Sequence, residues 1–185
     1  MQEFSGEQNA SSVDTLIKAA RAGNRNAFGR LVELHQSGIR RFLRSLARQE
    51  LDLADDLAQD TFIIAFQQIG RYRGEGSFAS WLTGIAYRRF LQYARKKKRR
   101  RRLLEGPAEA KLPQAQPGVA ERIDLERALN HLSLPEKTAL ILHSREGYTH
   151  TEIADVMELP LGTVKSHLAR GRDKIRGLLS GGLEP

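Results

Sequence analysis

The amino-acid sequence predicts an all-α protein made of two small helical domains joined by a flexible linker. Almost every long segment repeats its apolar residues with the period of a helix, and no segment alternates them as a half-buried strand does. The helical pattern breaks over residues 103–118, which contain three prolines and no apolar periodicity. We therefore expect domains over residues 12–100 and 119–180, joined by a linker over residues 101–118.

Four helices are predicted in the N-terminal domain, because four segments each carry a stripe of apolar residues. Their expected ranges are residues 14–21, 26–49, 53–69 and 77–95. A loop over residues 71–76, which contains two glycines, separates the third helix from the fourth.

The third predicted helix carries two apolar stripes on roughly opposite sides. One contains Leu53, Leu57 and Ile64; the other contains Ala58, Phe62, Ala65, Phe66 and Ile69. A small domain buries one stripe easily, so two stripes indicate either the central helix of a bundle or a helix with a partner surface. The residue pattern leaves open which stripe is exposed.

The loop and the fourth helix combine aromatic and basic side chains, as in surfaces that bind single-stranded nucleic acid. The aromatic residues are Tyr72, Phe78, Trp81, Tyr87, Phe90 and Tyr93, and the basic ones are Arg71, Arg73, Arg88, Arg89 and Arg95. Aromatic rings stack on unpaired bases and cations hold the backbone. For Phe78 and Leu82 the competing interpretation, a place in the domain core, is favoured.

The C-terminal domain has the pattern of a helix-turn-helix. Capping boxes at Ser133–Glu136 and Thr149–Glu152 predict two helix starts, and residues 158–162 form a turn before a last helix over about residues 163–178. In that last helix one side is apolar and predicted to be buried, and it consists of Val164, Leu168, Gly171 and Ile175. The opposite side is polar and basic, as expected of a recognition helix that enters the major groove.

Composition and charge narrow the function further. The chain has 30 lysines and arginines against 22 acidic residues and no cysteine, which favours a polyanionic partner and excludes disulfides and thiolate chemistry. No nucleophile–base pair or metal-ligand spacing occurs, so we expect no enzyme activity, cofactor or metal. No apolar segment reaches the length of a membrane helix, so we expect a cytoplasmic protein without membrane insertion.

Four short segments of the C-terminal domain resemble the fourth conserved region of the sigma-70 family of RNA polymerase sigma factors. They are residues 132–137, 148–154, 160–166 and 168–172. In that family this domain reads the minus-35 promoter element. The resemblance implies that the DNA-binding residues are Thr163, Lys165, Ser166, His167, Ala169, Arg170 and Arg172. His167 stands where the family often has arginine.

The N-terminal domain resembles the family's second conserved region in two places. Residues 55–66 are similar to the segment that docks on a coiled coil of the largest polymerase subunit, which implies contacts from Asp55, Asp56, Gln59, Asp60 and Ile63. Residues 72–86 are similar to the loop and helix that open the minus-10 element, which implies a site made of Tyr72, Arg73, Gly74, Ser77, Trp81, Arg88, Gln92 and Arg95. The family commonly has asparagine near position 88 and aspartate near position 92.

The N-terminal and C-terminal domains together resemble the extracytoplasmic-function (ECF) group of this family. This resemblance implies an alternative sigma factor that binds core RNA polymerase and directs promoter-specific initiation. The implied partners are core polymerase, promoter DNA in duplex and melted form, and an anti-sigma factor. The alternative is a stand-alone helix-turn-helix regulator, which would bind duplex DNA without polymerase. The basic run over residues 95–102 is expected to hold phosphates in a salt-sensitive, sequence-independent way.

Overall fold

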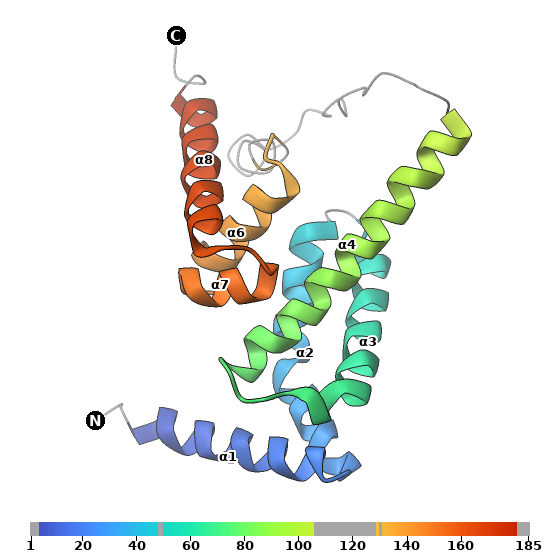
Figure 1. Cartoon of the computed structure of the whole chain (residues 1–185), viewed down its shortest axis with the longest axis vertical. Coiled ribbons are helices and arrows are strands. Elements are labelled where there is room, and N and C mark those ends of the chain that lie inside the picture. The colour runs from blue at the N-terminus through green and yellow to red at the C-terminus, as the bar shows by residue number, and fades with distance from the viewer. Residues whose placement is uncertain (1–3, 48–49, 106–128, 130, 181–185) are drawn as a thin grey trace. The chain divides into compact units, whose positions relative to one another are not determined.

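The computed structural model describes residues 4–47, 50–105, 129 and 131–180, and their secondary structure is helical without strands (Figure 1). This confirms the predicted all-α class. Backbone contacts divide the chain into two compact units, residues 1–90 and 91–185. None of the helices in these described ranges is long and apolar enough to cross a membrane.

The elements of the N-terminal part are α1 (Phe4–Arg21), α2 (Arg25–Ala47), α3 (Leu51–Gln68), the short 3-10 helix η1 (Ile69–Arg71) and α4 (Phe78–Glu105). Helix α1 begins ten residues earlier than predicted. It ends where Gly23 adopts a left-handed φ of 92°. The side-chain oxygen of Asn24 then accepts the Ala27 N–H at 3.1 Å and caps the start of α2.

Helix α2 packs against both α1 and α3, and α4 contributes to the same core. Leu31, Phe42, Leu43 and Leu82 are at most 1% exposed. Phe78 is also buried, at 4%, so the expectation that Phe78 and Leu82 belong to the core is confirmed.

Helix α4 continues through Glu105, so residues 101–105, expected in the linker, are helical. The rest of the expected linker, residues 106–118, lies outside the described residues, as does the expected start of the C-terminal domain at residue 119.

The C-terminal part contains α6 (Leu134–Ser144), α7 (His150–Met157) and α8 (Leu161–Ser180). Both predicted capping boxes are present, at the starts of α6 and α7. Helix α8 begins two residues before the predicted position, because the Pro160 carbonyl accepts the N–H groups of Thr163 at 2.9 Å and Val164 at 3.1 Å.

The turn between α7 and α8 depends on Glu158, which takes a left-handed backbone with φ of 54°. Its N–H bonds back to the last turn of α7. This conformation is unusual for a residue other than glycine or asparagine. The two helices therefore meet through a tight connection.

The predicted buried side of α8 is confirmed. Val164 and Leu168 are 0% and 2% exposed, Gly171 is buried and Ile175 is half-buried. At Gly171 the helix approaches α6 so closely that an added Cβ would lie 2.7 Å from Leu140 Cδ1. The opposite side of α8 is thereby presented outward.

Candidate functional site

The outward side of α8 carries the residues predicted to read duplex DNA. Lys165, Ser166, Ala169, Arg170 and Arg172 are exposed, while Thr163 and His167 are half-buried. Helix α7 and the turn at Glu158 lead into the first turn of α8, where Val164 packs into the core and the next two residues, Lys165 and Ser166, are exposed. This is the geometry of a recognition helix.

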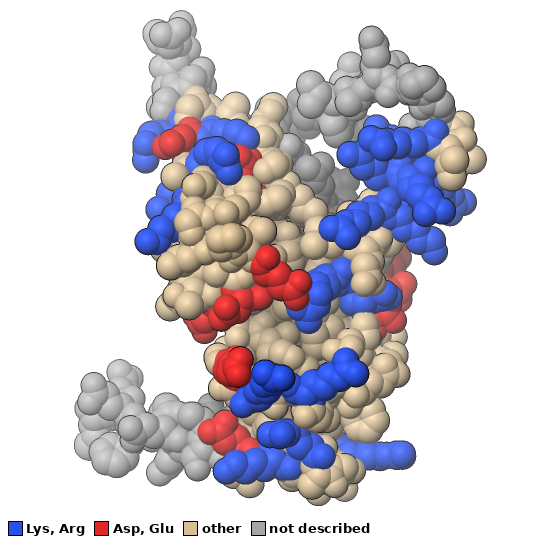
Figure 2. Space-filling view, viewed as in Figure 1, with Lys and Arg blue, Asp and Glu red and all other residues tan. Residues whose placement is uncertain are grey.

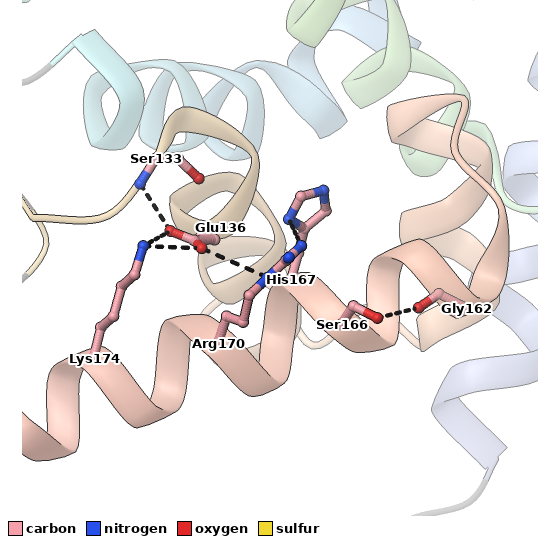
Figure 3. Close-up of polar contacts among 7 residues, drawn as sticks. All are labelled: Ser133, Glu136, Gly162, Ser166, His167, Arg170 and Lys174. Carbon is pink, nitrogen blue, oxygen red and sulfur yellow. Dashed lines mark hydrogen bonds and ion pairs between the residues drawn. The ribbon is translucent and has the colours of Figure 1, made fainter.

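Three of these side chains already interact with neighbours (Figure 3). Arg170 Nη2 lies 3.2 Å from His167 Nδ1, and the Ser166 hydroxyl donates to the Gly162 carbonyl at 2.9 Å. Arginine is always a donor, so His167 Nδ1 accepts in this contact and the proton of the neutral ring sits on Nε2. The helix therefore offers N–H donors from Lys165, His167 and Arg170, and an acceptor oxygen from Ser166.

Glu136, in the first turn of α6, fixes α8 to α6 (Figure 3). It is 5% exposed, accepts Lys174 Nζ at 2.7 and 3.0 Å and the Ser133 N–H at 2.9 Å, and lies 3.8 Å from Arg170 Nε. Burial alone would raise the pKa of Glu136, but hydrogen bonds from Lys174 and Ser133 and the Lys174 charge outweigh it and lower the pKa to about 2. The Glu136 carboxylate therefore stays charged at neutral pH, and its pairs with Lys174 and Arg170 keep α8 beside α6.

Replacing Glu136 with glutamine is expected to lower the free energy of unfolding of the C-terminal unit by about 1–3 kcal/mol at neutral pH, because the charge-assisted bonds are lost. The folded pKa is below its usual value of 4.5, so the unfolded chain binds more protons and this stabilisation is lost as pH falls from about 4.5 to 2. Hydrogen exchange of α8 amides at several pH values measures it.

Glu152→Gln is the matched control, since Glu152 forms the same capping box at the start of α7 and has no lysine partner among the described residues. We expect a smaller loss of stability there. An equal loss in both variants would show that capping alone, and not the Lys174 pair, accounts for the effect.

On α3 the five residues predicted to face polymerase fall into two groups. Asp56, Gln59 and Ile63 are exposed. Asp55 and Asp60 are half-buried and take part in ion pairs: Asp55 lies 3.1 Å from Arg44 on α2, and Asp60 pairs with Arg89 on α4. These two carboxylates therefore also fix α3 against its neighbours.

Five exposed residues of α3 form one stripe, which we call the α3 outer stripe; Leu51 and Gln67 of the same helix are also exposed. Its members recur at intervals of three or four residues and are Asp52, Asp56, Gln59, Ile63 and Phe66. Ile63 is 56% exposed and Phe66 42%, although the Phe66 ring also packs edge-on against Phe28 at 5.1 Å. Neither predicted apolar stripe is exposed as a whole, because Leu57 of one and Ala65 of the other are buried.

The loop before α4 is held in one shape by Tyr72. Its ring lies 5.4 Å from those of Phe78 and Trp81, and its hydroxyl donates to the Gly76 carbonyl at 2.9 Å. Gly74 and Gly76 take left-handed φ values of 80° and 78°, which suit glycine. Tyr72 is 8% exposed, so it builds the loop rather than offering a free face for stacking.

A surface hollow of about 800 Å³ opens beside this loop. The loop contributes Tyr72, Arg73, Gly74 and Ser77, and helices α1 and α2 contribute Asp14, Lys18, Arg21 and His35. The volume is within the range of small-ligand sites. The sequence interpretation missed the four helix residues, because only the packing of α1 and α2 brings them to the loop.

His35 is a half-buried polar residue of this hollow, and its Nε2 atom is buried. Its ring lies 5.4 Å from that of Phe78, and its Nε2 atom has no hydrogen-bond partner among the described residues. Burial lowers the pKa of His35, so the imidazole is neutral near pH 7. The wall of the hollow therefore combines a neutral imidazole with the exposed arginine of the loop, Arg73.

One face of α4 continues from the loop. Trp81, Arg88, Gln92 and Arg95 follow one another at helical spacing; the first two are half-buried and the last two exposed. Tyr87 and Phe90 are buried at 4% and 7%, so of the predicted stacking residues of α4 only Trp81 and Tyr93 retain accessible surface.

Two known families match successive parts of the chain. The family described as Sigma-70 region 2 matches residues 31–100, and Sigma-70, region 4 matches residues 122–175. The chain is 31% identical to the ECF RNA polymerase sigma factor SigM of Mycobacterium tuberculosis, covering 95% of this chain and 88% of that protein. It is 32% identical to the RNA polymerase sigma factor NccH of Alcaligenes xylosoxydans, covering 91% and 95%.

Two solved structures are also similar. The sigma factor RpoE of Bartonella quintana, in complex with the anti-sigma factor NepR, has a TM-score of 0.69 and 28% identity and covers 83% of this chain and 96% of that one. CnrH, in complex with the cytosolic domain of CnrY, has a TM-score of 0.68 and 25% identity, covering 92% and 98%. The helical units, their order and these matches together show that the chain belongs to the ECF group of sigma-70 family RNA polymerase sigma factors.

Proposed function

We propose that this sigma factor directs initiation through three surfaces: the α3 outer stripe for polymerase, the hollow and α4 for melted DNA, and the outward side of α8 for duplex DNA. The observation that carries this proposal is the α3 outer stripe. A small domain that exposes Ile63 and Phe66 beside buried apolar residues has an apolar surface for a partner. A stand-alone helix-turn-helix regulator has no need of that surface.

For polymerase binding, the proposed contacts are Asp56, Gln59 and Ile63, with Asp55 and Asp60 at the margin. The two marginal carboxylates are shared with arginines of this chain, so their charge is partly neutralised. We expect the apolar side chains to supply most of the affinity and the carboxylates to supply orientation.

For the minus-10 element, the proposed site is the hollow beside residues 72–77. A base that leaves the stack must enter a pocket that repays its unstacking, a few kcal/mol. The neutral imidazole of His35 is suited to hydrogen-bond the base edge of such a nucleotide, and Arg73 of the loop is suited to hold its phosphate. Trp81, Arg88, Gln92 and Arg95 would guide the adjoining strand along α4.

For the minus-35 element, the proposed reader is the first half of α8. Lysine, histidine and arginine donors suit the O6 and N7 acceptors of guanine, and we expect Thr163 and Arg172 to hold phosphates. Because Arg170 is shared with Glu136 and His167, Lys165 is the side chain we expect to discriminate bases most directly.

The chain's other properties follow from the same proposal. Sigma-70 family members are regulators rather than catalysts, and we infer that this chain has no catalytic activity of its own and works in the cytoplasm. We also infer an anti-sigma partner, because the RpoE structure is a complex with NepR. That partner would compete for the surfaces that bind polymerase or DNA.

The direct test is run-off transcription on genomic DNA with purified core polymerase, with and without this protein. Discrete new transcripts are expected, and their aligned start sites would reveal the two promoter elements. Absence of transcripts, together with tight duplex binding by the protein alone, would favour a stand-alone regulator.

Lys165→Ala is expected to relax base preference in the minus-35 element by about 1–3 kcal/mol at one position. Arg172→Ala, the control on the same helix, should weaken all sequences about equally, because a phosphate contact carries no sequence information. Initiation from a library of minus-35 sequences measures both. An unchanged preference in Lys165→Ala would contradict the assignment.

A further inference from the structure

The last turns of α4 are exposed on every side. All ten side chains from Arg95 to Leu104 are exposed, and the first eight are lysine or arginine. Figure 2 shows these cations gathered at the free end of α4. Leu103 and Leu104, at 78% and 75% exposed, follow at the tip. This segment, the basic helix, therefore has no buried face that could stabilise its helical form.

The charge of the basic helix opposes its own structure. Like charges three and four residues apart, such as Arg95 with Arg99 or Lys98 with Arg102, lie next to each other on a helix and destabilise it. A short helical segment without tertiary packing is already marginal in water. The ammonium of Lys97, 5.8 Å from the centre of the Tyr93 ring, supports the first turn of the segment. External negative charge would therefore stabilise this helix.

The spacing of the charges matches duplex DNA. Eight consecutive residues at a rise of 1.5 Å place one positive charge about every 1.5 Å over about 12 Å, and B-DNA carries one negative charge per about 1.7 Å of its axis. A single strand carries about half that density. The segment and the duplex can therefore neutralise one another almost one for one.

The distribution of the charges around the helix also favours a duplex. At about 100° per residue, eight successive cations leave no gap wider than about 60° around the circumference. A single strand would reach only one side of this ring. A helix lying along a major groove, which is about 12 Å wide, has phosphates on both flanks.

We propose that the basic helix is a sequence-independent clamp for duplex DNA, and that its helical form is stabilised by the phosphates of both strands. An anionic membrane surface fits less well, because a surface helix needs an apolar face along its length and here the leucines stand only at the tip. The clamp goes beyond the proposed promoter contacts, since it requires neither a base sequence nor polymerase.

The test uses the full chain without polymerase and measures binding to a 20-bp duplex of arbitrary sequence, and to one of its strands, over a range of salt concentrations. Two variants are compared with the wild type. Lys96→Gln/Lys98→Gln/Arg100→Gln/Arg102→Gln removes four charges while keeping a similar helix propensity. Arg99→Lys/Arg100→Lys/Arg101→Lys/Arg102→Lys keeps every charge and serves as the control.

In the four-glutamine variant we expect the slope of log K against log salt on the duplex to become less negative by about 3–4, and affinity at 0.1 M salt to fall about 100-fold or more. The lysine variant should match the wild type. Hydrogen exchange of residues 95–105 should slow on adding duplex, and much less on adding the single strand.

Equal slopes for the duplex and the single strand, or unchanged binding in the four-glutamine variant, would overturn the proposal. So would protection of residues 95–105 by anionic lipid vesicles but not by the duplex, which would identify a membrane surface as the partner. Because the four-glutamine variant keeps the outward side of α8, its difference from the wild type reports the basic helix whether or not the proposed promoter contacts are correct.

Discussion

Replacing Ile63 with aspartate is expected to weaken binding to core RNA polymerase by about 100-fold, with little effect on folding. Ile63 is 56% exposed in the middle of the α3 outer stripe, so its side chain contributes little to the core of the domain. An apolar residue at the centre of an interface is typically worth 2 kcal/mol or more, and a buried aspartate adds a desolvation cost. Titration of fluorescently labelled protein with core polymerase measures the loss.

The chain provides a matched control in Leu51→Asp. Leu51 is 55% exposed on the same helix but lies about 120° away from Ile63 around its axis. This variant should bind core polymerase nearly as well as the wild type. If both variants bound with the same reduced affinity, a general loss of apolar surface or of stability would explain the result, and the α3 outer stripe would not be the docking surface.

Helix α3 shows what the sequence could and could not predict. Its two apolar stripes predicted either the central helix of a bundle or a helix with a partner surface. The pattern could not tell which positions are buried and which are exposed. Residues from both stripes are buried, because α3 packs against more than one neighbour. The large exposed apolar residues of α3 are Leu51 and Ile63, which belonged to neither stripe, and Phe66, which belonged to one of the two stripes whose exposure the pattern left open. Burial depends on which helices pack there, and local periodicity does not contain that information.

The C-terminal part was predictable in more detail, since its signals are local. The capping boxes at Ser133 and Thr149 predicted the starts of α6 and α7, because capping depends on residues only three apart. The turn was less predictable: the left-handed residue is Glu158, while Gly162, the obvious candidate by propensity, lies inside α8. Here the packing of α7 on α8 overrides the local preference.

The hollow beside the loop was predicted only in part. The loop residues from Tyr72 to Ser77 could be selected from glycine spacing and family resemblance. His35, Lys18 and Arg21 could not, because they are more than 35 residues away along the chain and reach the loop only through tertiary packing. The same packing buries Tyr72, which the sequence interpretation had placed among the stacking residues.

Substituting Gly171 with valine is expected to destabilise the C-terminal unit by about 3 kcal/mol and to lower minus-35-dependent transcription at least tenfold. A Cβ at this position would lie 2.7 Å from Leu140 Cδ1 and 3.2 Å from its Cγ, and the branched side chain would extend further into α6. Relief of the clash requires α8 to move away, which would also lengthen the Lys174–Glu136 and Arg170–Glu136 pairs. Denaturant unfolding and promoter-specific run-off transcription measure the two effects.

Gly177→Val on the same helix isolates the cause, because nothing lies within 4 Å of a Cβ built at Gly177. It should change stability by no more than about 0.5 kcal/mol. A second test combines Gly171→Val with Leu140→Ala, which removes the clashing methyl groups. The double variant should recover part of the lost stability, giving a positive coupling of about 1 kcal/mol or more. If it lost the sum of the two single effects instead, close approach to Leu140 would not be the reason that this helix requires glycine.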